Sequence, residues 1–396
     1  MRKKIIFLLG FLVFMNLAPV CAQNAKWDAY WQRLSKLPLD SVRELKLEGM
    51  ALKEVPEALF VYREVRLIVL DNNLFTSIPE SLKRFPKLER LSIRRNLIAG
   101  NALNVSKLSQ LTLMDAGGNK LAKNLRVRTN RRLQKLVLDG MGVRQLKIVG
   151  KVPKEVDLSN SHVEKIHWLP FRQARVEVLV LHSNGLSSLP KGVSKMKKLR
   201  KLVLGNNGFE QIPKEMARMK KLESLMFYKN KLTHLPDFVW KMNSLTEVDI
   251  HHNRLAELPN EIGRLTQLKE LYLAHNCLRS LPDSLGNLSE LKFLYVENNE
   301  LEALPLSFSG LQSLERLSLL GNRFLVYPAV LIQMPWLQEL DISENDIEAF
   351  PTDFSKWKEL RLLLLHENAC KNGMACMLEL LMLEQKLNTE EVRVMY

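Results

Sequence analysis

The most prominent feature of the sequence is a spacing of apolar residues around an asparagine that recurs along the chain. Between Leu268 and Pro282, apolar residues stand eight, five and three positions before Asn276 and two and five positions after it. This spacing, written LxxLxLxxNxLxxLP, returns every 23 residues over nine consecutive units. The asparagines of these units are Asn184, Asn207, Asn230, Asn253, Asn276, Asn299, Asn322, Asn345 and Asn368. So long a register predicts one repeat array instead of several globular domains.

Each unit predicts a short β-strand followed by a turn. The two leucines of the LxL segment fall on the same face of a strand, because side chains alternate between its faces. Successive strands can then pair in parallel, with the leucines forming a continuous apolar wall. An asparagine side chain carries both a donor and an acceptor, so stacked asparagines can satisfy the backbone groups of the turns. The pattern therefore predicts a parallel sheet with one strand per repeat and a ladder of asparagines beside it.

The register extends toward the N-terminus through an irregular section. Met141 and Ser161 occupy the ladder position between Asn119 and Asn184, at spacings of 22, 20 and 23 residues, and Met50 occupies it in the first unit. The other ladder residues are Asn73, Asn96 and Asn119. We count fifteen repeats, near-regular over 42–119, irregular over 120–161 and regular over 162–368.

Residues 1–22 are predicted to be an export signal. Three basic residues precede an apolar run over 5–15, and small residues precede a cleavage site predicted after Ala22. The apolar run is too short for a comfortable membrane span. Lipidation of Cys21, or a retained anchor, is the alternative. The signal is of a bacterial type, and it leaves the periplasm, the cell surface and secretion open as destinations.

Segments on both sides of the array are expected to close its ends, because terminal repeats expose an apolar face. In residues 23–41, Trp27, Tyr30 and Leu34 follow the spacing of an amphipathic helix. Residues 369–396 carry methionines and leucines at helical spacing, which predicts a C-terminal helical cap.

The repeat unit resembles those of the leucine-rich-repeat superfamily, in particular the 23-residue class of Scribble-type and Ras-adaptor scaffolds and of exported bacterial repeat proteins. The resemblance covers roughly residues 42–368 and rests on the LxxLxLxxNxLxxLP motif. It implies an α/β fold, namely a curved leucine-rich-repeat solenoid with a parallel sheet on its concave face. It also implies recognition of a protein on that face, without naming the partner.

Residues two, four and six positions before the ladder residue are expected on the concave face, and the residue just before it at the rim. Tyr272 and Tyr295 occupy equivalent positions in adjacent repeats, on strands about 4.8 Å apart. Aromatic side chains on an open face suggest a binding hot spot for a protein or peptide. The alternative is that neighbouring aromatics stabilise each other by about 0.2–1 kcal/mol without any ligand. The candidate contact residues are Tyr228, Asp249, His251, His252, Tyr272, His275, Phe293 and Tyr295.

The histidines and Asp249 of this set raise two further hypotheses, a zinc site and a hydrolase. Imidazole and carboxylate groups suit zinc, but their spacing here follows from the repeat and no His-Glu-x-x-His pair is present. The sequence also has no nucleophile elbow, P-loop or dinucleotide-binding glycine motif. We therefore expect no metal, no cofactor and no enzymatic activity, with a hydrolase as the least favoured alternative.

Charge is distributed unevenly along the 396 residues. The overall charge is +15, but residues 23–233 hold 41 basic and 19 acidic side chains, whereas 234–396 hold 14 and 24. The excess peaks at 120–154, with eleven basic residues and one acidic residue. The basic patch comprises Lys120, Lys123, Arg126, Arg128, Arg131, Arg132 and Lys135. It favours a second hypothesis, an envelope or adhesion protein that binds acidic polysaccharide or a host surface, although such runs are more commonly solvated faces.

The sequence as a whole predicts an exported, monomeric recognition module. Nucleic acid is disfavoured as a partner, because export is predicted and the aromatic residues lie in the acidic half. Cys370 and Cys376 are close enough to form a disulfide in an oxidising envelope, although Cys370 also suits a small buried position.

Overall fold

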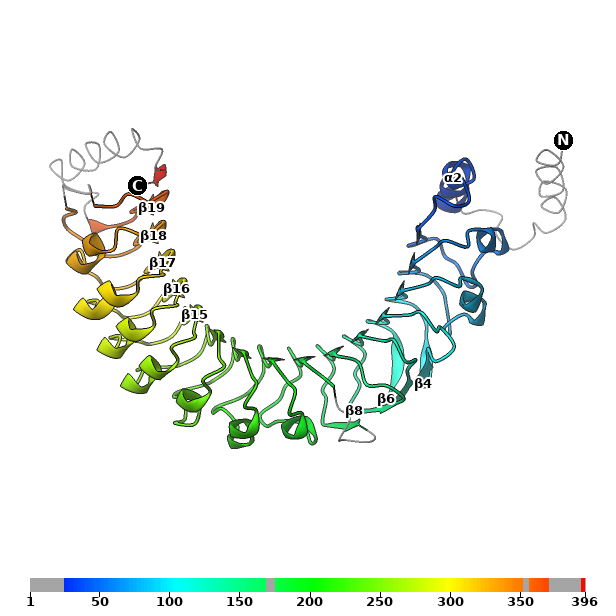
Figure 1. Ribbon diagram of the computed structural model, residues 1–396, viewed down its shortest axis with the longest axis horizontal. Helices are drawn as coiled ribbons and strands as arrows, with labels where there is room; N and C mark the ends of the chain where they lie inside the picture. The colour runs from blue at the N-terminus through cyan, green and yellow to red at the C-terminus, as the bar shows by residue number, and fades with distance from the viewer. Residues whose placement is uncertain (1–24, 169–174, 352–355, 370–392, 396) are drawn as a thin grey trace.

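The computed structural model describes residues 25–168, 175–351, 356–369 and 393–395. The chain forms a long arc of stacked coils whose two ends lie at opposite tips (Figure 1). Short strands line the inner, concave side of the arc, and 3₁₀ helices lie on the outer, convex side of most repeats. The predicted solenoid is confirmed.

One parallel sheet of sixteen strands lines the concave side within the described residues. Equivalent residues face each other across neighbouring strands, as Leu271 faces Leu294. The strands are β1 (Glu44–Lys46), β2 (Leu67–Val69), β3 (Arg90–Ser92), β5 (Leu113–Asp115), β7 (Lys135–Val137), β9 (Glu155–Asp157), β11 (Val178–Val180), β12 (Lys201–Val203), β13 (Ser224–Met226), β14 (Glu247–Asp249), β15 (Glu270–Tyr272), β16 (Phe293–Tyr295), β17 (Arg316–Ser318), β18 (Glu339–Asp341), β19 (Leu362–Leu364) and β20 (Arg393–Met395). The last strand lies within the segment that we assigned to the C-terminal cap.

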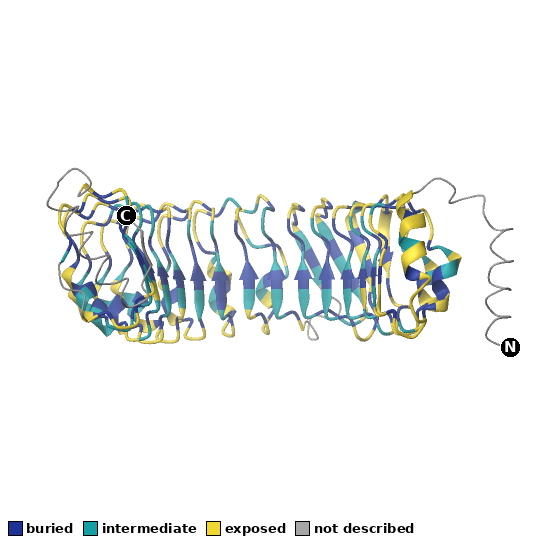
Figure 2. Ribbon diagram, turned by 90° about the horizontal axis from the view of Figure 1, so that it is seen from above, coloured by how far each residue is buried: buried dark blue, intermediate teal, exposed yellow. Residues whose placement is uncertain are grey.

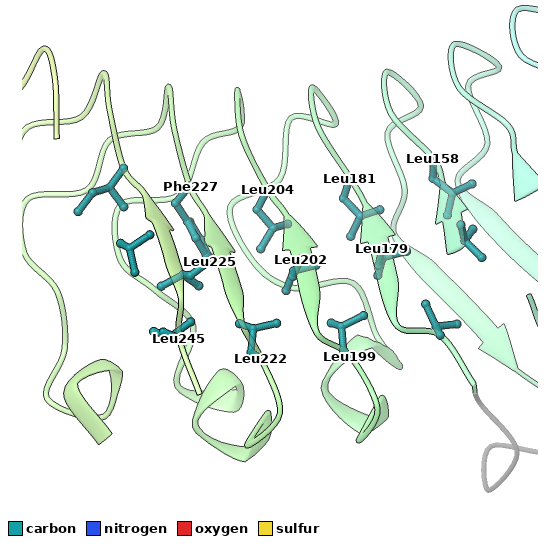
Figure 3. Packing of buried hydrophobic residues seen from close by; sticks show 14 of the residues in the cluster. Leu158, Leu179, Leu181, Leu199, Leu202, Leu204, Leu222, Leu225, Phe227 and Leu245 are labelled. Atoms are coloured by element: carbon teal, nitrogen blue, oxygen red, sulfur yellow. The ribbon is translucent and has the colours of Figure 1, made fainter. Parts of the chain in front are cut away.

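The core is a row of leucines that runs along the whole arc. Leu202 and Leu204 point inward from β12 and its turn, against Leu225 and Phe227 of the next repeat (Figure 3). All four are completely buried. Full burial of such a side chain contributes about 1.5–3 kcal/mol, so each repeat is stabilised mainly by its two neighbours.

The asparagines form the ladder beside this core. Asn253 accepts a hydrogen bond from the Leu232 amide at 2.9 Å and donates one to the Phe227 carbonyl at 2.9 Å. It also donates to the Ile250 carbonyl of its own repeat, at 2.9 Å. The same pair of bonds to the preceding repeat, to the amide 21 residues back and the carbonyl 26 residues back, is made at all twelve asparagine positions.

Most repeats carry a 3₁₀ helix on the convex side. Several helices begin just after the proline of the LxxLP segment, as η7 follows Pro259, because proline has no amide proton to satisfy at a helix start. The described helices are η1 (Glu57–Val61), η2 (Glu80–Arg84), η4 (Val193–Lys195), η5 (Lys214–Arg218), η6 (Val239–Lys241), η7 (Asn260–Arg264), η8 (Asp283–Asn287), η9 (Leu306–Gly310) and η10 (Ala329–Gln333).

In the irregular section strands replace these helices. A second parallel sheet, in the order β10-β8-β6-β4, lies on the convex side (Figure 1). Its strands are β4 (Ala99–Asn104), β6 (Lys120–Arg128), β8 (Gln145–Val149) and β10 (Lys165–Trp168). A strand advances about 3.3 Å per residue and a 3₁₀ helix about 2 Å, so fewer residues cross the convex side. The shortened repeats therefore mark a change of convex wall, and the concave sheet continues through them.

The first repeat is covered by helix α2 (Ala25–Leu34), with Trp27 and Leu34 buried beneath it. The Tyr30 hydroxyl accepts a hydrogen bond from the Lys46 amide of β1 at 3.2 Å. The predicted signal over 1–22 and the methionine-rich part of the predicted C-terminal cap lie outside the described residues. Among the residues that are described, no helix is both long and apolar enough to span a membrane.

Candidate binding surface on the concave face

The residues between the leucines of each strand project from the sheet onto the concave side. Figure 2 looks onto the arc from above, and its strands carry mainly buried and half-buried residues. Tyr228, His251, Tyr272 and Tyr295 are half-buried on the strands and turns from β13 to β16. We call the rings of His182, Tyr228, His251, Tyr272 and Tyr295 the aromatic surface.

Tyr272 and Tyr295 stack face to face at the acidic end of the aromatic surface. Their ring centroids are 5.3 Å apart and their planes differ by 2°. The Tyr272 hydroxyl donates to Oε2 of Glu270 at 2.7 Å, and burial, followed by this bond, raises the pKa of Tyr272. The Tyr295 hydroxyl makes no hydrogen bond within the described part of the chain. One hydroxyl of the pair is therefore fixed, and the other is available to a ligand.

Tyr228 lies between two histidines in the same column of the sheet. Its hydroxyl is 3.0 Å from Nδ1 of His182, and its ring stacks on His251 with centroids 5.1 Å apart. Gly205 stands between the two bonded residues, and a Cβ atom there would lie 2.2 Å from Cζ of Tyr228. Our sequence analysis missed His182, and the signal that could have revealed it is the glycine at a position where neighbouring repeats carry large side chains.

Two further histidines lie at the rim beside this column. His252 and His275 both adopt positive φ, at 52° and 54°, and their rings stack in parallel with centroids 4.0 Å apart. Burial, and then the proximity of His275 and His251, lowers the pKa of His252. The third histidine is held differently, because Nδ1 of His251 is 2.6 Å from Oδ1 of the buried Asp249.

The histidines do not converge on a common point. Among the described residues there is no group of three or more His, Cys, Asp or Glu side chains placed to hold a metal ion. The imidazoles are instead paired with a tyrosine, a carboxylate and each other. Phe293 lies beside this surface on β16, with the Arg316 guanidinium 5.4 Å from its ring centroid.

Charged side chains form a second kind of contact across the concave face. Nζ of Lys201 reaches Oε2 of Glu247 at 3.2 Å, past Ser224, whose hydroxyl donates to the same carboxylate. In the basic half, Nη1 of Arg94 lies 2.9 Å from Asp115 and 2.7 Å from Asp139. Our sequence analysis missed this cluster too, since it depends on Gly117, where a Cβ would lie 2.7 Å from Nη1 of Arg94.

The basic patch that we expected as one surface is divided by the fold. Lys135 projects onto the concave face and pairs with Glu155 at 2.5 Å. Arg131 and Arg132 lie in the loop between β6 and β7. The residues on convex strand β6 are Lys120, Lys123, Arg126 and Arg128. The division follows from the coil of each repeat, which carries neighbouring residues from the convex side to the concave side.

The cysteines add one observation. Cys277 is exposed and carries a free thiol. Cys21, Cys370 and Cys376 lie outside the described residues.

Comparison with known proteins agrees with this geometry. Residues 258–394 match a family model described as a leucine-rich repeat region, and residues 197–255 match one described as a leucine rich repeat. Together with the fold, these matches make the chain a leucine-rich-repeat protein, a fold that supports a protein-interaction module. No curated protein matches the sequence.

Solved structures show the same fold. A leucine-rich-repeat protein of Leptospira interrogans is 24% identical, with 92% of this chain and 98% of that chain covered and a TM-score of 0.71. An internalin of Listeria monocytogenes is 18% identical, with 93% of each chain covered and a TM-score of 0.52. Drosophila Toll, in its complex with Spatzle, is 21% identical, with 80% of this chain and 46% of that chain covered and a TM-score of 0.61.

Proposed function

We propose that this chain is an exported, non-enzymatic recognition module that binds a protein or peptide on the concave face. The observation that carries the proposal is the aromatic surface, a set of rings fixed in parallel stacks on an open sheet. Tyrosines are frequent among the residues that dominate binding energy, and rings that are already ordered lose little freedom on binding. An open strand surface also suits an extended partner better than an enclosed small molecule.

The charges around the aromatic surface indicate the chemistry of the partner. Asp249, Glu270 and Glu297 lie on the same strands and turns, in the acidic half of the chain. Such a surface favours a segment that carries Arg or Lys beside aromatic or aliphatic residues. The Toll structure offers a parallel in which a protein of this fold is seen in a complex, with Spatzle.

The test is binding of peptides selected from a display library by the wild-type protein. The variant Tyr272→Ser/Tyr295→Ser removes the stack, and Leu325→Ser/Val326→Ser removes two exposed apolar side chains that lie outside the concave strands. We expect selected peptides to be rich in basic and aromatic residues and to lose binding only with the tyrosine variant. Equal binding by both variants, with unchanged thermal unfolding, would place the binding site elsewhere.

Export has its own test, supported by the basic head, the apolar run and the small residues of the N-terminal segment. Expression in a bacterial host, followed by intact mass measurement and cell fractionation, should give a chain beginning at Gln23 outside the cytoplasm. A chain beginning at a diacylglycerol-modified Cys21 would support the lipidated alternative. A full-length chain in the cytoplasm would refute export.

A further inference from the structure

A recess of about 1060 Å³ lies along one edge of the solenoid, away from the aromatic surface. Its lining segments directly precede concave strands, including 129–132 before β7 and 150–152 before β9. Between η2 and η4 the described chain has convex strands instead of 3₁₀ helices. The recess therefore lies in the section where the outer wall of the solenoid changes.

The recess is strongly basic. Its lining includes five cationic side chains and no aspartate or glutamate, and within the described residues none of the five forms an ion pair. These residues are Arg131, Arg132, Lys151, Arg175 and Lys198. Cations just before the strands of other repeats are paired with the adjacent repeat, as Arg200 is with Glu223 at 2.7 Å. Five clustered cations without a carboxylate repel one another, so an anion from outside the chain would be stabilised there.

The floor of the recess is firmly built. The side chains of Thr129 and Asn130 are buried, and the Thr129 hydroxyl donates to the Lys151 carbonyl at 2.8 Å. Nζ of Lys151 donates in turn to the Arg131 carbonyl at 2.7 Å, which links the two loops. Gly150 has a φ of +108°, and a Cβ there would lie 2.7 Å from the Thr129 carbonyl oxygen. The cations are thus carried by loops that are tied together.

We propose that this recess binds a short acidic sugar chain through its carboxylate or sulfate groups. Guanidinium and ammonium groups pair with such oxyanions, and Ser109 and Gln110 on the opposite wall can bond to sugar hydroxyls. A water molecule occupies about 30 Å³ of liquid, so a single sulfate ion would leave most of the recess filled with solvent. The proposal narrows the charge of the basic half to one site and does not depend on the aromatic surface.

The test measures binding of a heparin-derived sulfated hexasaccharide to the full chain by calorimetry at physiological salt. The recess variant Arg132→Ser/Arg175→Ser/Lys198→Ser is compared with Lys120→Ser/Lys123→Ser/Arg126→Ser, which removes the same charge from the convex face of β6. We expect the recess variant to bind about tenfold more weakly or worse and the β6 variant to change less than about threefold, because contact pairs outweigh screened distant charge.

Three results would overturn the proposal: equal loss in both variants, equal binding of a neutral dextran hexasaccharide, or full competition by inorganic sulfate at the same sulfate concentration. Hydrogen exchange of the wild-type protein gives a test that does not depend on the folding of a variant. The hexasaccharide should protect amides at 129–132 and 150–152, whereas protection confined to β6 would refute the site. The Tyr272→Ser/Tyr295→Ser variant should bind the hexasaccharide normally, which separates this site from the peptide surface.

Discussion

The Tyr228 hydroxyl lies 3.0 Å from Nδ1 of His182, although the two residues are 46 positions and two full repeats apart. The contact crosses Gly205, the equivalent residue of the repeat between them. A long side chain can reach across a neighbouring repeat only where that repeat carries a small residue. Such bridges join three consecutive strands, so they fix the position of concave side chains more firmly than a pair of neighbours could.

The bridge predicts that Gly205→Ala will disturb the aromatic surface. The new methyl group would overlap the Tyr228 ring, which must then leave His182 and its stack on His251. We expect a loss of about 1 kcal/mol in the free energy of unfolding, the usual net value of one hydrogen bond, measured by urea denaturation. Gly208→Ala is the matched control, because its Cβ would make only an ordinary contact at 3.5 Å. Equal effects of both substitutions would contradict the bridge.

The ladder predicts a larger loss at its centre. In Asn253→Ala the Leu232 amide and the Phe227 carbonyl both lose a buried partner, so we expect the free energy of unfolding to fall by about 1–3 kcal/mol. Asn243→Ala, at an exposed position, should change it by less than about 0.5 kcal/mol. Urea denaturation of both variants checks the difference, and a change near zero in Asn253→Ala would remove the energetic case for the ladder.

The periodic part of this structure could be predicted from sequence, and the contacts between columns could not. The positions of Leu271 and Asn276 follow from a local spacing that is the same in every repeat, so each unit predicts its own strand and turn. The His182–Tyr228 bond depends instead on three residues that lie side by side only after the coils have stacked. The basic patch failed as a single surface for the same reason, since one coil places Arg126 and Lys135 on opposite sides.

The convex strands are an intermediate case. The alternation in 145–149, where Leu146 and Ile148 are buried between partly exposed neighbours, is the period-two pattern of a strand. It is only five residues long, and the loss of the 23-residue register obscured it. A repeat shortened to 20 residues was the stronger indication, because it leaves too few residues for the usual helical convex side.

The rim histidines predict a pH dependence of stability. Because the pKa of His252 is lowered in the folded chain by burial and by His275 and His251, the unfolded chain binds this proton more readily. The contribution of His252 to stability is therefore complete well above its usual pKa of about 6.5 and is lost as the pH falls below it. We expect His275→Gln to raise the pKa of His252, observed by NMR titration of the ring. His234→Gln, at an exposed position outside the stack, should leave that titration unchanged, and an unchanged titration in His275→Gln would exclude coupling between the rings.

The cluster around Arg94 predicts a pH dependence of the opposite sign in a variant. Arg94→Met leaves Asp115 and Asp139 close together without a cation, so we expect the free energy of unfolding to fall by about 2 kcal/mol at neutral pH. Burial already raises the pKa of Asp115, and loss of the guanidinium should raise it further, so acidification should restore part of the lost stability. Arg66→Met breaks an exposed pair with Glu89 and should cost less than about 1 kcal/mol at any pH. Urea denaturation of both variants across the acidic range checks this, and parallel pH profiles would show that the Arg94 cluster is no more than a surface ion pair.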